Sequence, residues 1–211
     1  MTTTIQSTRI FCIGRNYLDH VNELSNQRPA EPVIFMKPPT CLVKPGLPIQ
    51  FPKHGQELQH EVEVVVQIGT AGYVKSVEEA KTFIAAITIG LDLTLRDVQS
   101  GLKQKGLPWE KAKAFENSAP IGDLLPYNDQ IDLETISFGC RVNGQERQVG
   151  NTGNMLFSIP EILLAISTIW KFEIGDLIYT GTPAGVGSLN TGDEIEIYSD
   201  LTDSFSWRIT D

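Results

Sequence analysis

The sequence has few cysteines and no long hydrophobic run, and each shortage excludes a class of protein. Its three cysteines, Cys12, Cys41 and Cys140, lie far apart without a CxxC pair, so neither a disulfide framework nor a zinc knuckle is expected. No apolar segment approaches the length of a membrane span, and the N-terminal MTTTIQSTRIFCIG lacks the basic and apolar regions of a signal peptide. We therefore predict a soluble, cytoplasmic protein.

Basic residues are also in the minority. The chain has 17 Lys and Arg against 26 Asp and Glu, which gives a formal net charge of -9, and no basic cluster interrupts this excess. A negatively charged surface repels phosphate groups. We expect neither nucleic acid nor an anionic membrane surface as a partner.

The pattern of apolar segments predicts a β-rich α+β protein. A chain of 211 residues can bury a substantial core as a single domain, here expected to span 1–211. Gly and Pro separate short apolar runs, which favours strands and few helices. Helices are predicted at 16–25, at 76–87, where Ser76 and Glu79 have capping-box spacing, and at 158–169; ITIGLDLTLRDVQ, residues 87–99, is predicted to be a strand.

The stretch HEVEV, residues 60–64, places two glutamates on one face of a strand. Because strand side chains alternate, Glu61, Glu63 and Val65 share a side. Neighbouring anions at an apolar face repel one another, and burial disfavours their charged forms, so something must compensate them. A solvent-exposed face is the alternative, but Val65 continues the same face and argues against it.

A third carboxylate, Asp92, lies on a separate predicted strand after one intervening helix, close enough in sequence for the two strands to be neighbours. Three hard oxygen ligands without a histidine or cysteine cluster suit Mg²⁺ or Mn²⁺ better than zinc. The sequence therefore predicts that Glu61, Glu63 and Asp92 bind a divalent cation.

Two further groups of residues have alternative interpretations. His20 and Glu23 are three apart on a predicted helix, so Glu23 could orient His20 as a general base, although such pairs on surface helices are usually only solvated. Lys113, in WEKAKAF, would hold a substrate carboxylate or a developing enolate beside a cation; otherwise it is a solvated lysine beside Lys111.

The glycine-rich stretch GTPAGVG, residues 181–187, is not a nucleotide-binding loop, because it lacks GK[ST] and the GxGxxG spacing. It predicts a turn whose exposed amides bind an anion, with the Thr182 hydroxyl as a further donor. A simple hairpin connection is the alternative.

Several stretches together resemble the fumarylacetoacetate hydrolase family, in particular its short members of the acylpyruvase and oxaloacetate-handling type. They are GRNYLDH at 14–20, EPVIFMKP at 31–38, HEVEV at 60–64, LDLTLRDVQ at 91–99, LPWEKAKAFENSAP at 107–120 and TGTPAGVG at 180–187. The resemblance implies a mixed β-roll with a few peripheral helices, usually a homodimer, with the metal at the mouth of the roll.

The resemblance also assigns roles to residues. It implies Glu61, Glu63 and Asp92 as metal ligands, and His20 with Glu23 as a water-activating pair on a lid at residues 14–26. It places the site lysine at Lys113 and implies that Gly181 and Thr182 contact the substrate carboxylate. Arg15 would anchor the lid or contact a substrate carboxylate, and Lys37 and Gln99 are weaker candidates for the same pocket.

These residues predict a metal-dependent enzyme for small 2-oxo acids. A 2-oxo acid can chelate a divalent cation, which polarises its carbonyl and stabilises an enolate. Hydrolysis of acylpyruvates, decarboxylation of oxaloacetate and its keto–enol tautomerisation all proceed through such an enolate. Two alternatives remain: a hydratase, isomerase or decarboxylase of oxo-dienoates from aromatic degradation, which would not need the His20–Glu23 pair, and a non-catalytic binding protein of the same fold.

Overall fold

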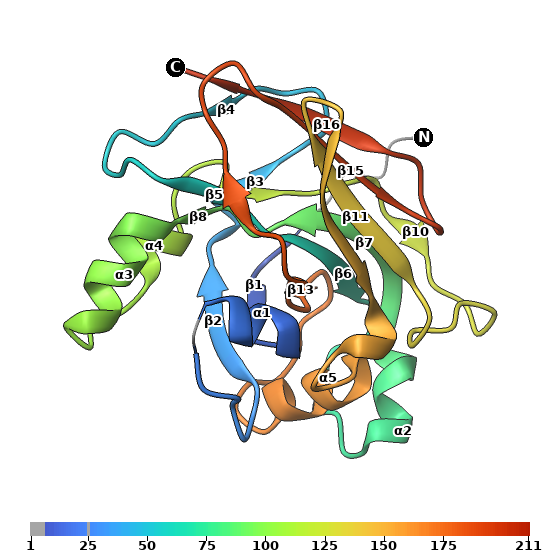
Figure 1. Ribbon diagram of the computed structural model, residues 1–211. Helices are drawn as coiled ribbons and strands as arrows, with labels where there is room; N and C mark the ends of the chain where they lie inside the picture. The colour runs from blue at the N-terminus through green and yellow to red at the C-terminus, as the bar shows by residue number, and fades with distance from the viewer. Residues whose placement is uncertain (1–6, 25) are drawn as a thin grey trace.

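The computed structural model describes residues 7–24 and 26–211, and strands form most of its regular structure (Figure 1). The largest sheet is mixed: β1 and β13 pair in parallel, and all other neighbouring strands in this sheet pair antiparallel. In spatial order its six strands are β10 (Leu125–Pro126), β7 (Ile84–Leu91), β6 (Val62–Ile68), β13 (Leu177–Tyr179), β1 (Ile10–Gly14) and β2 (Val33–Lys37).

Three further sheets complete the β structure. A five-stranded sheet has the order β12 (Gln145–Asn151), β11 (Ser137–Val142), β15 (Glu194–Ser199), β16 (Phe205–Thr210) and β4 (Ile49–Gln50). The smaller sheets are β14 (Gly187–Ser188), β5 (Leu58–His60) and β8 (Thr94–Leu95), and β3 (Leu42–Val43) with β9 (Ala119–Pro120).

Helices are short; in Figure 1 α3 and α4 lie on one side of the sheets, α2 and α5 lie together on another, and α1 lies in front of β1. They are α1 (Leu18–Glu23), α2 (Val77–Ala80), α3 (Arg96–Gln104), α4 (Glu110–Lys113) and α5 (Ile159–Ser167), with 3₁₀ turns η1 (Pro39–Cys41), η2 (Lys81–Phe83) and η3 (Thr152–Asn154). The predicted β-rich α+β roll with a few peripheral helices is confirmed. Within the described part of the chain, no helix combines the length and apolar character that crossing a membrane requires.

Strand β6 is covered on both faces. Val64 and Val66 enter the main hydrophobic core, whereas Val65 packs in a smaller cluster with Cys12 and Tyr179. The two glutamates on the Val65 side are therefore buried, with Glu61 5% and Glu63 1% exposed. The solvent-facing alternative for this pair is wrong.

Two of the predicted helices form, and the third is shorter than predicted because its last residues are a strand. The segment 16–25 contains α1, although Ser25 lies outside the described residues, and 158–169 contains α5, whose Ser158 and Glu161 form a capping box. The segment 76–87 is α-helical over Val77–Ala80 and continues as the 3₁₀ turn η2 over Lys81–Phe83, after which β7 begins at Ile84. Pairing of β7 with β6 along its length outweighs the local helix signal.

The predicted strand 87–99 ends earlier than expected. After the short strand β8, the chain turns into helix α3 at Arg96. Asp97 in its first turn accepts hydrogen bonds from the backbone N–H groups of Gln56 (2.9 Å) and Glu57 (3.3 Å), which fixes the start of the helix against the preceding loop. Arg96 and Gln99 are therefore helical residues.

Burial on α5 predicts where substitution costs stability. Ile162 is fully buried, so Ile162→Ala should lower the free energy of unfolding by about 2–5 kcal/mol. Ile169, just beyond the helix, is 60% exposed, and Ile169→Ala should change the free energy of unfolding by less than about 0.5 kcal/mol. Urea denaturation followed by circular dichroism measures both; equal effects would contradict the packing of α5.

Candidate metal centre and active site

Three buried carboxylates meet where β6 and β7 lie side by side. Glu63 on β6 is opposite Gly90 of β7. Asp92 directly follows β7, and its N–H donates to the Glu61 carbonyl (2.8 Å). Carboxylate oxygens of Glu61, Glu63 and Asp92 lie within 4.8 Å of one another. The structure thus brings together the three residues predicted as metal ligands.

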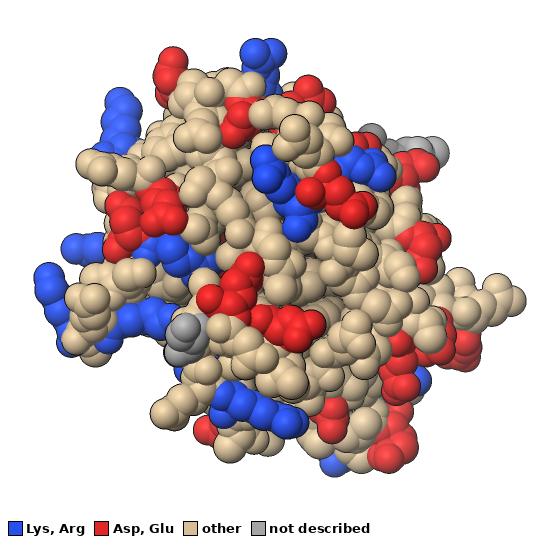
Figure 2. Space-filling view, viewed as in Figure 1, with Lys and Arg blue, Asp and Glu red and all other residues tan. Residues whose placement is uncertain are grey.

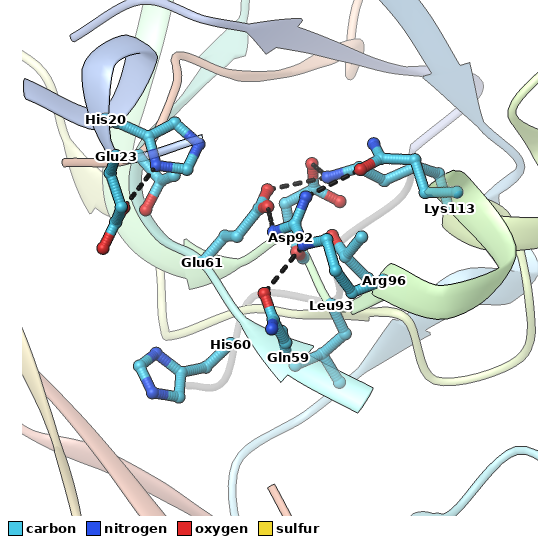
Figure 3. A network of polar contacts seen from close by, with 12 residues as sticks. His20, Glu23, Gln59, His60, Glu61, Asp92, Leu93, Arg96 and Lys113 are labelled. Atoms are coloured by element: carbon cyan, nitrogen blue, oxygen red, sulfur yellow. Dashed lines mark hydrogen bonds and ion pairs between the residues drawn. The ribbon is translucent and has the colours of Figure 1, made fainter. Parts of the chain in front are cut away.

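Three side-chain cations contact two of these carboxylates. The Lys113 Nζ lies 2.7 Å from Glu61 Oε2 and 2.6 Å from Asp92 Oδ2, and Arg96 Nη2 donates to Glu61 Oε1 (Figure 3). The Lys37 Nζ lies 2.8 Å from Asp92 Oδ1, without hydrogen-bond geometry. Side chains of the protein itself therefore compensate the charges of Glu61 and Asp92, in addition to the bound cation that the sequence pattern predicts.

Glu63 has a different environment. It accepts a hydrogen bond from the Gly181 N–H (2.7 Å), and none of the described lysines, arginines or histidines forms an ion pair with it. Burial and the charge of Asp92 raise the pKa of Glu63 well above its ordinary value. Burial also opposes ionisation of Glu61, but the charges of Lys113 and Arg96 outweigh it and hold the pKa of Glu61 below its ordinary value.

The donor set fits a hard divalent cation. Asp92 Oδ1 is buried without a hydrogen-bond partner, and Glu63 has no cationic partner among the described residues. Within the part of the chain that the structure describes, Asp92 Oδ1 has only the ion-pair contact with Lys37, and Glu63 accepts a single backbone hydrogen bond, so both carboxylates keep acceptor positions that suit a ligand between them. An all-carboxylate set of this kind is typical of Mg²⁺ or Mn²⁺ sites.

His20 and Glu23 of α1 form the predicted pair beside this cluster. His20 Nδ1 lies 3.0 Å from Glu23 Oε2, and His20 is only 5% exposed. In Figure 3 the pair lies on one side of Glu61 and Lys113 on the other. The second Glu23 oxygen accepts a hydrogen bond from the Gly185 N–H (3.0 Å). With Nδ1 bonded to Glu23, the Nε2 atom of His20 is left for proton transfer.

Most of the predicted site residues line one narrow recess. Its lining includes Arg15, His20, Glu61, Glu63, Gln99, Lys113 and Thr182. The recess has a volume of about 30 Å³, room for about two water molecules. The backbone of Arg15 has a φ of +62°, a left-handed conformation that residues other than glycine rarely adopt. Gln99 accepts a hydrogen bond from Arg96 Nη1 (2.7 Å).

Lys37 has a structural environment that corrects the sequence expectation. Its Nζ donates to the carbonyls of Leu93 (3.2 Å), Ser118 (2.9 Å) and Lys113, which uses all three N–H donors of a lysine. It is 1% exposed and does not line the recess. Lys37 therefore holds Asp92 and the neighbouring backbone instead of facing a substrate.

The turn at Gly181 also differs from the expectation of exposed, anion-binding amides. The Gly181 N–H is bonded to Glu63. The Thr182 hydroxyl donates to the Val62 carbonyl (2.9 Å) and accepts from Gln148 Nε2 (2.8 Å). Thr182 thus faces the recess with one acceptor lone pair remaining.

Sequence reasoning missed Arg96, which contacts Glu61 and also donates through Nε to Gln59 Oε1 (2.7 Å). The residue stands in the LDLTLRDVQ motif, whose apolar pattern predicts a strand, and strand geometry does not predict this contact. The signal that could have identified it is Asp97, a helix-starting residue beside it.

A buried all-carboxylate cation site next to a His–Glu pair, in a β-rich fold, defines a metal-dependent enzyme. The chain belongs to the fumarylacetoacetate hydrolase family: residues 9–203 match the family model described as fumarylacetoacetate (FAA) hydrolase C-terminal. The recognition of this family from sequence is confirmed.

Relatives of known name and structure agree with this membership. The chain is 42% identical to the mitochondrial oxaloacetate tautomerase of Rattus norvegicus over 95% of this chain and 90% of the relative. The crystal structure of fumarylpyruvate hydrolase from Pseudomonas aeruginosa, in complex with Mn²⁺ and pyruvate, matches with a TM-score of 0.94 at 32% identity, over 100% and 92% of the two chains. The crystal structure of a 5-carboxymethyl-2-hydroxymuconate delta-isomerase from Mycobacterium smegmatis matches with a TM-score of 0.85 at 31% identity, over 97% of this chain and 79% of that one.

The carboxylate cluster predicts stabilisation by divalent cations. A cation that binds only the native state raises its stability by RT ln(1 + [M]/Kd), so Mg²⁺ or Mn²⁺ should raise the unfolding temperature and a chelator should reverse the shift. Glu63→Gln should abolish the shift, whereas Glu78→Gln, on the surface of α2, should retain it. Thermal unfolding with and without cation measures this. Identical melting of the apo and metal-treated proteins would exclude the metal centre.

Proposed function

We propose that this chain is a divalent-metal-dependent enzyme that acts on small 2-oxo acids through an enolate. The observation that carries the proposal is the cluster of Glu61, Glu63 and Asp92, whose ligand oxygens lie within 4.8 Å of one another beside Lys113. These carboxylates would hold the cation, which supplies polarisation of the substrate carbonyl and electrostatic stabilisation of the enolate.

Lys113 is suited to bind developing negative charge. A lysine has three N–H donors, and two acceptors, Glu61 and Asp92, are directed at its Nζ. The third donor can reach a substrate oxygen. Burial opposes its charge, but Asp92 and Glu61 outweigh burial and raise the pKa of Lys113 above its ordinary value. The side chain therefore remains a cation where an enolate oxygen forms.

The His20–Glu23 pair is suited to activate water. Glu23 accepts from Nδ1 of His20, so Nε2 can take a proton from a water molecule. For an acylpyruvate, the hydroxide equivalent attacks the distal carbonyl, and the bond between C3 and C4 breaks. Its electrons pass to the pyruvate enolate, which takes up a proton, and a carboxylic acid leaves.

Oxaloacetate needs less from the pair. In decarboxylation, loss of CO₂ from oxaloacetate would form the same pyruvate enolate beside Lys113. In tautomerisation, removal of a proton from C3 and its return would interconvert the keto and enol forms of oxaloacetate. The names of two relatives, an oxaloacetate tautomerase and a fumarylpyruvate hydrolase, support 2-oxo acids as the substrate class. The name of the mycobacterial isomerase supports the alternative, an oxo-dienoate substrate, and this alternative gives no role to the His20–Glu23 pair.

The segment 14–26 is proposed as a lid. Arg15, His20 and Leu24 of this segment line the recess, which is narrow, so outward movement of the segment would widen the entrance and its return would bring His20 and Glu23 to the substrate. Within it, Arg15 is proposed to contact a substrate carboxylate, together with Nε2 of Gln99, whose Oε1 is already bonded to Arg96. Thr182 also lines the recess, but its hydroxyl proton is bonded to the Val62 carbonyl, so it could only accept a hydrogen bond from a substrate group. We further propose a homodimer, a cytoplasmic location and Mg²⁺ or Mn²⁺ as the working cation.

Removal of the Lys113 charge should separate metal binding from catalysis. Lys113→Met keeps the aliphatic stem, so the Mn²⁺ affinity should survive while kcat falls about a hundredfold, roughly 3 kcal/mol of barrier. Lys111→Met, an exposed neighbour on α4, is the control. Steady-state kinetics with oxaloacetate and acetylpyruvate, alongside Mn²⁺ titration, measure both effects. Wild-type turnover by the Lys113 variant would remove this residue from the mechanism.

The reactions should respond differently to loss of the His20–Glu23 pair. Hydrolysis requires an activated water, so His20→Ala or Glu23→Gln should lower acetylpyruvate cleavage by roughly two to four orders of magnitude. Oxaloacetate decarboxylation should fall much less, and tautomerisation should be intermediate, because it needs a proton acceptor but no nucleophile. Asp19→Asn, exposed on the same helix, is the control.

All three rates are measured on one preparation of each variant, with the metal content determined in parallel. Equal losses in the three reactions would show that His20 acts through lid closure or substrate positioning. Unchanged rates would exclude the pair from catalysis.

A further inference from the structure

Gln148 on β12 occupies a position that the strand pattern would give to an apolar residue. It is fully buried, whereas its neighbour Val149 is 61% exposed. The pairing of β12 with β11 shifts at this point: Gln148 is opposite Cys140, while Glu146 is opposite Arg141, so Arg147 is an extra residue. Such bulges redirect side chains and are frequent beside active sites.

Every hydrogen-bonding position of the buried amide is used. Gln148 Oε1 accepts from the Val62 N–H (3.1 Å) and from His60 Nδ1 (2.9 Å). Its Nε2 donates to Thr182 Oγ1 (2.8 Å) and to the Pro183 carbonyl (2.8 Å). Because the Val62 N–H can only donate and the Pro183 carbonyl can only accept, the orientation of the amide is fixed. Gln148 thus connects the backbone of Val62, between Glu61 and Glu63, to the turn at residues 181–185.

That turn supplies one backbone amide to each half of the candidate site. The Gly181 N–H donates to Glu63 Oε2 (2.7 Å), and the Gly185 N–H donates to Glu23 Oε1 (3.0 Å). Both glycines are left-handed, with φ of +105° and +98°. Added Cβ atoms would lie 2.6 Å from Asn16 Cβ and 2.3 Å from the Arg147 carbonyl oxygen. The N–H groups of Gly181 and Gly185 therefore point at Glu63 and Glu23 only while the turn keeps this left-handed, closely packed conformation.

We propose that Gln148 is a positioning residue, which through the turn at 181–185 keeps Glu63 of the metal centre aligned with Glu23 of the His20–Glu23 pair. It touches neither substrate nor metal. Residues that orient metal ligands through hydrogen bonds typically contribute 10- to 100-fold to metal affinity or activity. The catalytic part of this inference rests on the proposed function, but the structural part does not.

Two substitutions separate the contacts of Gln148. Gln148→Glu keeps the size and one acceptor oxygen but removes both donors to Thr182 and Pro183. Gln148→Met keeps the approximate size and removes these four hydrogen bonds together with the longer one from Cys140 Sγ (3.6 Å). Gln145→Met, an exposed glutamine on the same strand, is the matched control. Folding of each variant is checked by circular dichroism and thermal unfolding.

The first measurement is hydrogen–deuterium exchange of the metal-free proteins, read by mass spectrometry on peptides that cover 180–187 and helix α5. Exchange of 180–187 should be at least about tenfold faster in both Gln148 variants, because the Gly181 and Gly185 amides lose their fixed directions, while α5 should exchange as in the wild type. The control should match the wild type in both segments.

The second measurement pairs the Mn²⁺ affinity with kcat and KM for acetylpyruvate. We expect roughly 10- to 100-fold weaker Mn²⁺ binding or lower kcat, with KM nearly unchanged. Wild-type exchange at 180–187 would overturn the proposal, as would a uniform rise in exchange across the chain or failure of both variants to fold, since these indicate general stability only. If the wild-type protein turns over no oxo acid, the proposed function fails, while exchange and Mn²⁺ affinity still decide the role of Gln148.

Discussion

Burial of three carboxylates at one point of the β6–β7 pair is the constraint on which the rest of the structure depends. Charges removed from water are costly unless they are paired and hydrogen-bonded. Lys37 from β2, Arg96 from α3 and Lys113 from α4 provide this for Asp92 and Glu61. The positions of α3 and α4 beside the sheet are therefore favoured by the ion pairs that Arg96 and Lys113 form with the buried carboxylates. Glu63 is left with a single backbone amide, and this unequal compensation marks the cluster as a ligand site.

The two halves of the site come from different parts of the chain and meet through backbone groups. The carboxylates lie in or directly beside strands β6 and β7, whereas His20 and Glu23 belong to a six-residue helix that lies in front of the sheet in Figure 1. The turn at 181–185 bonds to both halves. In the proposed mechanism, the sheet would keep the metal ligands fixed while α1 moves, and the turn would define where the helix returns.

The chemistry follows from the charges at the site. An enolate is stabilised by nearby positive charge, whichever bond breaks to form it, so one site can serve hydrolysis, decarboxylation and tautomerisation. The names of the relatives divide among such reactions. Figure 2 shows both acidic and basic side chains on this face of the molecule.

The sequence by itself determined the β-rich class, the helix at α5, and the grouping of Glu61, Glu63 and Asp92, because alternation along a strand and capping-box spacing are local signals. Family motifs added His20, Glu23 and Lys113. Only the tertiary structure decided that Lys37 holds Asp92, that Arg96 begins a helix and reaches Glu61, and that Gln148 is buried beside an exposed Val149. Each of these depends on contacts between residues tens of positions apart, and on strand pairing that outweighs local propensity, neither of which a short stretch of sequence encodes.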